Sequence, residues 1–197
     1  MNYLVYDALT TLAVPPAAAW VALRSRHRPL LARFSPVVPK GMNAPFWVHA
    51  CSVGELSVAR PVIAALKERY PDVPTVLTVS TVTAWDMASK NPAGAALAWF
   101  PIDQRTVVAR FFQRLKPRAL LLMETEIWPN VLREADRRGV PTLVLNARLS
   151  DKHFARYKRH APFFQTVFSR ITHVAAQHST YVDRFTSLGV DRARVTV

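Results

Sequence analysis

Three glutamates of this 197-residue chain stand close behind apolar stretches and could exchange a proton with a ligand. Glu55 lies five residues beyond the mostly apolar stretch 46–50, and Glu124 and Glu126 follow the wholly apolar stretch 119–123. A carboxylate in a crevice can act as a general base and take the proton from an attacking hydroxyl group. Two neighbouring acids can divide such roles, because repulsion and burial move their pKa values apart. For each glutamate the alternative is local, since an acid near a helix N-terminus stabilises the helix.

Further polar residues follow other apolar stretches and are candidates for ligand binding. Asn146 and Arg148 come after the stretch 142–145, and Gln177 comes after 173–176. An arginine can bind a phosphate or a carboxylate through two parallel hydrogen bonds, and its alternative is a surface ion pair. Gln177 could hydrogen-bond a ligand or cap a turn.

Ser52 and Gly54 are the candidates beside Glu55, and the glycine would permit a tight turn there. The six histidines show no HExxH or similar ligand spacing. The single cysteine, Cys51, excludes an internal disulfide and a multi-cysteine zinc site. The sequence therefore predicts neither a bound metal nor a resident cofactor.

Strands that alternate with amphipathic helices would position these residues. Short apolar stretches predict six strands, at 46–50, 75–79, 97–100, 119–123, 142–145 and 173–176. Apolar residues at helical spacing predict helices near 58–66, 107–115 and 129–138, the last of which ends at Gly139. Pro61 predicts that the helix after Glu55 either begins near 57–60 or is kinked.

This alternation predicts an α/β fold, a Rossmann-like parallel sheet with helices on both faces. Ligands of such sheets bind outside the carboxyl ends of the strands, and we expect the glutamates and the other candidates to lie there. The sequence contains neither GxGxxG nor GxxxxGK[ST], which argues against the usual dinucleotide and P-loop sites.

The N-terminal segment, residues 1–34, has a different character. Residues 3–23 are mostly apolar and are followed at once by basic residues, as far as Arg33. About 20 residues span a bilayer, although Asp7 and the prolines at 15–16 interrupt the apolar run. We expect a membrane-associated helix with a basic cytoplasmic flank, either spanning the bilayer or lying in its interface. A buried helix is the alternative. A proline-rich connector, 35–45, would separate this segment from a domain at 46–197.

The charge balance favours an anionic partner. Lys and Arg number 26 against 13 Asp and Glu, which gives a formal net charge of +13. Nucleic acid, an acidic membrane surface and a phosphorylated substrate all fit this excess. The basic and aromatic run 152–160 could face a membrane or a substrate, or it could be the solvated face of a helix.

Five motifs occur in order along the chain: SVGE at 52–55, PID at 101–103, METEIWPN at 123–130, NARLS at 146–150 and AAQ at 175–177. In these motifs, and in its apolar N-terminal segment with trailing arginines, the chain resembles the N-terminal domain of the bacterial 3-deoxy-D-manno-octulosonic acid (Kdo) transferases. The resemblance covers nearly the whole chain. The strings ETEIWPN and NARLS are its most specific parts.

The resemblance implies the acceptor-binding half of a two-domain GT-B glycosyltransferase of lipopolysaccharide biosynthesis, on the cytoplasmic side of the inner membrane. Such an enzyme transfers Kdo from CMP-Kdo to a lipid A precursor and inverts the anomeric carbon. The family's general base corresponds to Glu55, and its acid for transition-state stabilisation corresponds to Glu124. The implied partners are the lipid A precursor, CMP-Kdo and an anionic membrane surface, with no nucleic acid. An orienting role for Arg148 is inferred from its chemistry alone.

The sequence departs from the family pattern in three places. Ala84 and Trp85 stand where a glycine is expected after the second strand, and the bulky Trp85 could narrow that loop or change acceptor preference. Phe34, Ser35 and Pro36 replace a basic Trp-Gly-Glu-Arg segment. The chain ends at Val197, within an expected strand, so we expect that the donor domain is missing and that this fragment alone is inactive.

Two rival functions remain open from the sequence. One is a basic α/β module that binds membrane or nucleic acid without catalysis, in which the two glutamate loops would lie far apart. The other is a different GT-B enzyme, such as an epimerase or another lipid-linked sugar transferase.

Overall fold

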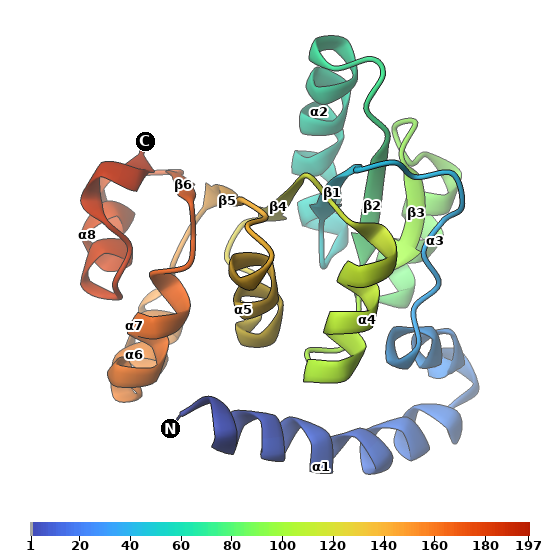
Figure 1. Ribbon diagram of the computed structural model, residues 1–197, viewed down its shortest axis with the longest axis horizontal. Helices are drawn as coiled ribbons and strands as arrows, with labels where there is room; N and C mark the ends of the chain where they lie inside the picture. Colours follow the sequence, from blue (N-terminus) through green and yellow to red (C-terminus); the bar gives the residue numbers. More distant parts are fainter. Residues whose placement is uncertain (1) are drawn as a thin grey trace.

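The computed structural model describes residues 2–197 and contains one parallel sheet of seven strands in the order β3-β2-β1-β4-β5-β6-β7 (Figure 1). The strands are β1 (Phe46–His49), β2 (Thr75–Val79), β3 (Ala96–Trp99), β4 (Ala119–Met123), β5 (Thr142–Ala147), β6 (His173–Ala176) and β7 (Val195–Thr196). The six predicted strands are confirmed, with ends that differ by at most two residues. The strand expected at the end of the chain is also present, as β7.

The helices are α1 (Tyr3–Ala22), α2 (Val53–Arg69), α3 (Val82–Lys90), α4 (Arg105–Leu115), α5 (Pro129–Arg137), α6 (Asp151–Arg159), α7 (Ala161–Phe168) and α8 (Ser179–Ser187), with 3₁₀ helices η1 (Ser25–Phe34) and η2 (Arg192–Arg194). Residues 35–45 form neither helix nor strand. The predicted end of α5 is confirmed, because Gly139 has a φ of 67° and its N–H donates to the Asp136 carbonyl.

Of the two alternatives predicted for α2, a start near 57–60 is wrong. This helix begins at Val53 and continues through Pro61. Ser52 is its N-cap residue, and the side chain of Ser52 accepts a hydrogen bond from the Glu55 N–H. This cap starts the helix before the proline, and Pro61 then lacks the N–H that would bond to the turn before it.

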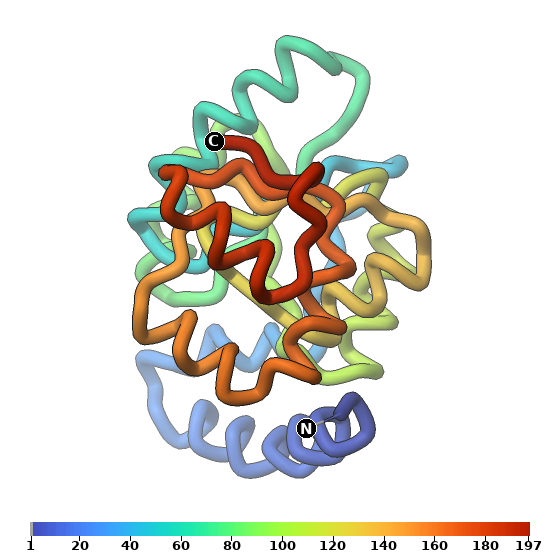
Figure 2. The backbone as a smooth tube through the Cα atoms, turned by 90° about the vertical axis from the view of Figure 1, so that its left-hand side faces the viewer, coloured from blue at the N-terminus to red at the C-terminus, as the bar shows by residue number. Residues whose placement is uncertain are grey.

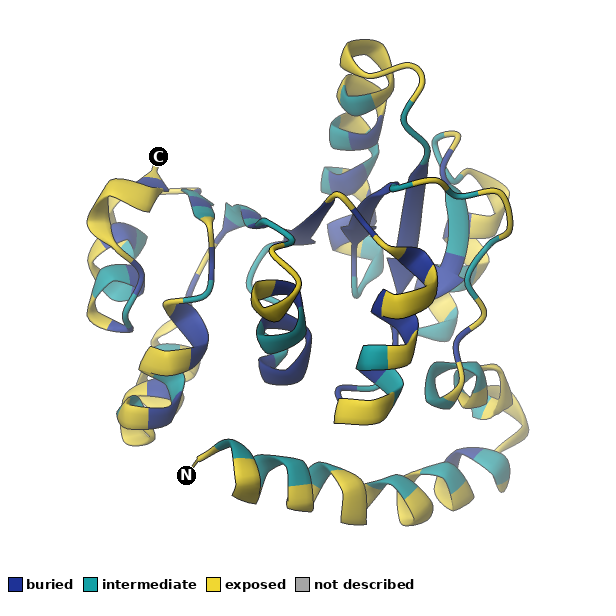
Figure 3. Ribbon diagram, in the orientation of Figure 1, coloured by how far each residue is buried: buried dark blue, intermediate teal, exposed yellow. Residues whose placement is uncertain are grey.

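The sheet is covered on both faces, as predicted. Side chains alternate along β1, so Trp47 joins the core under α4, α5, α7 and α8, whereas Val48 joins the core under α2 and α3. In β4, Leu120 and Leu122 face the first of these cores, and Leu121 and Met123 face the second. The central strands are almost wholly buried (Figure 3), which explains why they read as continuous apolar runs.

Helix α1 lies across one end of the molecule, beneath α4, α5 and the α6–α7 pair (Figures 1 and 2). Its inner face is tied to the domain by Tyr3, Tyr6 and Asp7, which bind the Pro129 carbonyl, the Asp103 carboxylate and the Arg133 guanidinium. Its outer face is apolar and exposed, and carries Leu4, Leu9, Leu12 and Trp20. By length and hydropathy, α1 is the one helix of residues 2–197 that could cross a membrane.

The basic run 152–160 forms most of α6. Tyr157 is buried there, whereas Lys152, Arg156, Lys158 and Arg159 are exposed. The run is therefore an exposed basic helix face, which is compatible with both interpretations.

Candidate active site

The strand order reverses between β1 and β4, and the loops that follow these two strands meet at the carboxyl edge of the sheet. In doubly wound sheets this reversal opens the crevice in which ligands bind. Glu55 comes from the β1 side of the crevice, and Glu124 and Glu126 come from the β4 side. The rival function without catalysis required these loops to lie far apart, which is not what the structure shows.

Glu55 sits in the first turn of α2 rather than in a projecting loop, and it is only 6% exposed. Its carboxylate accepts hydrogen bonds from the Cys51 N–H (2.8 Å) and the Ser52 hydroxyl (3.0 Å). Burial and the charge of Glu126 together raise the pKa of Glu55 to about 7, whereas these hydrogen bonds oppose the rise. Glu55 therefore does cap its helix, and it is also poised to exchange a proton near neutral pH.

Gly54 makes no tight turn, contrary to the prediction. It lies within the first turn of α2, where an added Cβ would contact only the Ser52 hydroxyl, at 3.9 Å. Gly54 is exposed at the surface beside Glu55. Its lack of a side chain leaves that surface open.

Glu126 is the acid that the fold brings next to Glu55. A carboxylate oxygen of each lies within 4.8 Å of the other and of the Cys51 sulfur. The indole N–H of Trp128 donates to Glu126 (3.1 Å). Burial raises the pKa of Glu126, and the hydrogen bonds and the charge of Arg33 oppose this rise. The sequence suggested the pair Glu55 and Glu124, whereas Glu126 is the closer partner.

This trio has the spacing of a metal site. Burial and the two carboxylates raise the pKa of the Cys51 thiol to about 12, so the free thiol is protonated at neutral pH. Both carboxylates also already accept hydrogen bonds from the protein. The absence of a metal from the mechanism stays a prediction.

Glu124 occupies the opposite wall of the crevice and is held by Arg148. The Arg148 guanidinium donates to the Glu124 carboxylate over 3.0 Å, and Thr125 donates to the Arg148 carbonyl. Glu124 and Asn146 both have left-handed backbone, with φ values of 55° and 54°. This conformation costs roughly 1–2 kcal/mol for a residue with a side chain, and such strain concentrates at functional sites.

Asn146 lies inside β5, not after it, at an irregularity in the pairing of β5 with β6. The irregularity turns the end of β5 and places Arg148 against Glu124. No local pattern indicates this irregularity, because the apolar residues of the strand end at position 145.

A hollow of about 260 Å³ opens beside this wall. It is lined by Glu124, Thr125, Glu126, Arg148, Ser150, His153 and Tyr181. Gln177 lies on the same edge of the sheet but after β6, three strand spacings from β1, or about 14 Å. We call Glu55, Glu124 and Glu126 the acidic cluster. Gln177 is exposed and is not part of it.

Arg33 is a residue of the site that sequence reasoning treated only as part of a basic flank. It ends the N-terminal segment and donates to the carbonyls of Phe100 (3.0 Å) and Ser80 (3.3 Å), which follow β3 and β2. No spacing in the sequence could have indicated this, since 47 and 67 residues separate the partners.

The family model described as 3-deoxy-D-manno-octulosonic-acid transferase (kdotransferase) matches residues 23–197, which is most of the chain. The chain belongs to this family.

Curated members of the Kdo transferase family extend the match. The 3-deoxy-D-manno-octulosonic acid transferase of Haemophilus influenzae is 30% identical over 204 aligned positions, which cover 98% of this chain and 47% of that protein. The transferase of Bordetella pertussis is 41% identical over 119 positions, covering 57% of this chain and 27% of its own length. A probable mitochondrial transferase of Arabidopsis thaliana is 34% identical over 165 positions, covering 79% of this chain and 36% of its own length. The chain thus spans less than half of the length of these relatives.

Among solved structures, MurG of Acinetobacter baumannii matches with a TM-score of 0.49 and 10% sequence identity, over 78% of this chain and 44% of its own.

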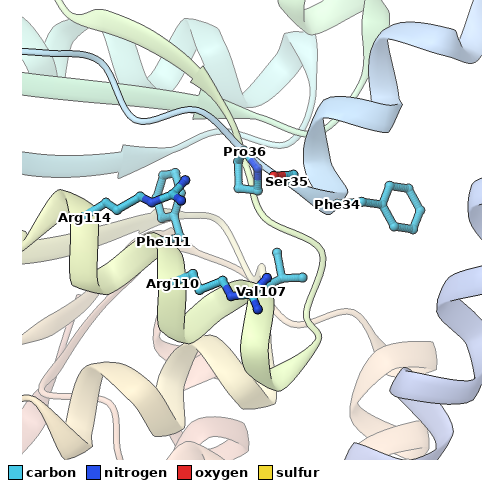
Figure 4. A pocket seen from close by; sticks show the side chains of 7 residues that line it. All are labelled: Phe34, Ser35, Pro36, Val107, Arg110, Phe111 and Arg114. Atoms are coloured by element: carbon cyan, nitrogen blue, oxygen red, sulfur yellow. The ribbon is translucent and has the colours of Figure 1, made fainter.

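The structure shows what surrounds two of the departures from the family pattern. Trp85 belongs to α3, and its ring stacks on Trp99 of β3 with centroids 4.3 Å apart, so it packs on the sheet and does not narrow a loop. The segment Phe34, Ser35 and Pro36 lines a hollow of about 100 Å³ against Arg110 and Arg114 of α4 (Figure 4). None of the residues of that hollow belongs to the acidic cluster.

Proposed function

We propose that this chain is the acceptor-side part of an enzyme that transfers Kdo from CMP-Kdo to a lipid A precursor in lipopolysaccharide biosynthesis. Family membership supports the reaction class, and the names of the relatives supply the sugar. The observation that carries the proposal is the buried Glu55 beside Glu126, in the crevice between β1 and β4. A carboxyl group with a pKa near 7 matches what a general base needs at neutral pH.

In this mechanism Glu55 accepts the proton of the acceptor hydroxyl as its oxygen attacks the anomeric carbon of Kdo. The new carbon–oxygen bond forms as the bond to the phosphate oxygen of CMP breaks, which inverts the carbon and releases CMP. Glu124, fixed by Arg148, faces the hollow and stabilises positive charge that develops on the sugar. Ser52 holds Glu55 in place through its hydroxyl.

The exposed Arg148 at the edge of the crevice suits the anionic groups of the substrates. Arg148 is exposed and can bind a second anion while it holds Glu124. Asn146 and Gln177 are further polar candidates on the same edge of the sheet. CMP-Kdo would be held mainly by a donor domain, as in a GT-B enzyme.

We propose further that α1 lies in the interface of an anionic membrane on the cytoplasmic side. Its inner face is fixed to the domain by polar contacts, while its outer face offers leucines and Trp20. A helix with one docked and one apolar face suits the interface better than a span. Sedimentation with vesicles rich in anionic lipid should pull down the chain, and Leu9→Gln with Leu12→Gln should abolish this. Equal binding by this variant would contradict the placement.

The transfer reaction is tested by joining the chain to the C-terminal half of the Haemophilus influenzae transferase. Incubation with CMP-Kdo and a lipid A precursor should give a product heavier by one or more Kdo units, measured by mass spectrometry. The unfused chain is the control and should give none. A correctly folded chimera that binds both substrates without transferring Kdo would refute the proposal.

A further inference from the structure

Arg33 links the N-terminal segment to the acidic cluster through both its main chain and its side chain. Its carbonyl accepts a hydrogen bond from the Ile102 N–H (3.0 Å), while its guanidinium donates to the Phe100 and Ser80 carbonyls. Three hydrogen bonds of one residue therefore fix the end of η1 over the carboxyl ends of β2 and β3. The surrounding fold, rather than a flexible side chain, sets the position of this cation.

The guanidinium lies beside the groups that hold Glu126. Its central carbon is 6.0 Å from the centre of the Trp128 ring, and the N–H of that same ring donates to Glu126. Burial lowers the pKa of Arg33, and the charge of Glu126 counteracts this. In return, the charge of Arg33 lowers the pKa of Glu126 and of Cys51 against the effect of burial.

We propose that Arg33 is a positioning residue of the acidic site: it supplies the counter-charge that keeps Glu126 ionised, so that Glu55 is the member of the pair that exchanges the proton. Two carboxylates this close do not ionise independently. The one beside the fixed cation ionises first, and its charge then hinders ionisation of the other. The acid–base role of Glu55 in this inference rests on the proposed function.

The other charged or titratable groups around the pair do not replace Arg33. They are Cys51 beside the end of β1, Glu124 in the loop after β4, Arg148 bound to Glu124, His153 and Tyr157 of α6, and Tyr181 of α8. Arg148 is already paired with Glu124, and the remaining groups are neutral or acidic. Arg33 is thus the cation that acts on Glu126.

The few glutamates of the chain can be followed individually to test the role of Arg33. The chain has only five glutamates, at positions 55, 68, 124, 126 and 134. Labelling the glutamate carboxyl carbons with ¹³C lets NMR follow each acid through a pH titration, with Glu55→Gln and Glu126→Gln assigning the signals.

Replacing Arg33→Met should raise the midpoint of the Glu126 titration, because loss of the cation removes a charge that favours the ionised carboxylate. Arg33→Lys retains the charge and should lie closer to the unsubstituted protein. Arg118→Met is the matched control, since Arg118 also donates to a main-chain carbonyl, that of Ala44, but precedes β4 at the far end of that strand.

An unchanged Glu126 midpoint in a folded Arg33→Met protein would overturn the proposal, and so would a lower midpoint. Equal effects of methionine and lysine would also overturn it, because they would indicate a purely structural role. If Arg33→Met does not fold, the NMR titration of the unsubstituted protein tests the proposal. Glu126 must then ionise at a lower pH than Glu55, and the reverse order would overturn the proposal. None of these measurements needs a sugar substrate, so they stand apart from the transfer assay.

Discussion

Two buried carboxylates, Glu55 and Asp103, differ in the groups that surround them. Asp103 accepts hydrogen bonds from the Tyr6 hydroxyl (2.7 Å) and from the N–H groups of Asn130 (3.0 Å) and Val131 (2.9 Å). It thereby joins α1 to the start of α5. Glu55 accepts two hydrogen bonds and faces another acid, Glu126.

Burial raises the pKa of both groups, to about 6 for Asp103 and to about 7 for Glu55. The difference lies in the neighbours. The nearby charge of Arg133 lowers the pKa of Asp103, whereas that of Glu126 raises the pKa of Glu55. A raised pKa alone therefore does not identify a catalytic acid, and the sign of the neighbouring charge is more informative.

The largest expected effect separates the two acids by activity. In the chimera, Glu55→Gln should lower kcat roughly 10²–10⁴-fold, the usual contribution of a general base. The fold should persist, because the glutamine oxygen can still accept the Cys51 N–H. Steady-state kinetics and circular dichroism measure the two outcomes. Glu68→Gln, on the exposed end of α2, is the control, and near-normal turnover of Glu55→Gln would remove Glu55 as the base.

Asp103→Asn should instead reduce stability. An amide offers one acceptor oxygen where the carboxylate offers two, so a buried N–H or hydroxyl loses its partner, at a cost of about 2 kcal/mol. Urea denaturation measures this loss, with the exposed Asp72→Asn as control. If the unfolding free energy stays unchanged, Asp103 does not tie α1 to α5.

The pH dependence of stability should differ between the unsubstituted protein and Glu55→Gln. A pKa raised from 4.5 to about 7 means that the folded state holds the proton more tightly than the unfolded state. The contribution of Glu55 to stability is then complete below pH 4.5 and is lost as pH rises to about 7.

The unfolding free energy of Glu55→Gln should accordingly improve relative to the unsubstituted protein over this range, by roughly 1–2 kcal/mol after allowance for solvent screening. Urea denaturation at pH 4.5, 6 and 7.5 measures the difference. A difference that is constant with pH would show that Glu55 does not titrate in this window.

The smallest effect should come from the pair of Glu124 and Arg148. The Arg148 side chain is 60% exposed, so water screens the pair. A double-mutant cycle with Glu124→Gln and Arg148→Met should give a coupling energy of about 0.2–1 kcal/mol in urea denaturation. A coupling above about 2 kcal/mol would place this pair with the buried groups rather than at the rim.

Much of the fold was predictable because burial leaves a local trace. A strand such as β4 is covered on both faces and consists of apolar residues alone. The start of α2 was not predicted. Pro61 suggested a later start, whereas the Ser52 cap begins the helix at Val53. Likewise, Gly54 suggested a turn where the backbone is helical, and Trp85 suggested a narrowed loop where its ring stacks on Trp99.

The sequence by itself determined the alternation of strands and helices, the family, and the loops that carry the acids, since each depends on residue types at short spacing. Only the tertiary structure decided which acids meet. Residues 55 and 126 become neighbours because β1 pairs with β4, and Arg33 joins them because α1 and η1 fold back over the sheet. Long-range pairing and the charge around a buried group depend on packing of the whole chain, which no local pattern records.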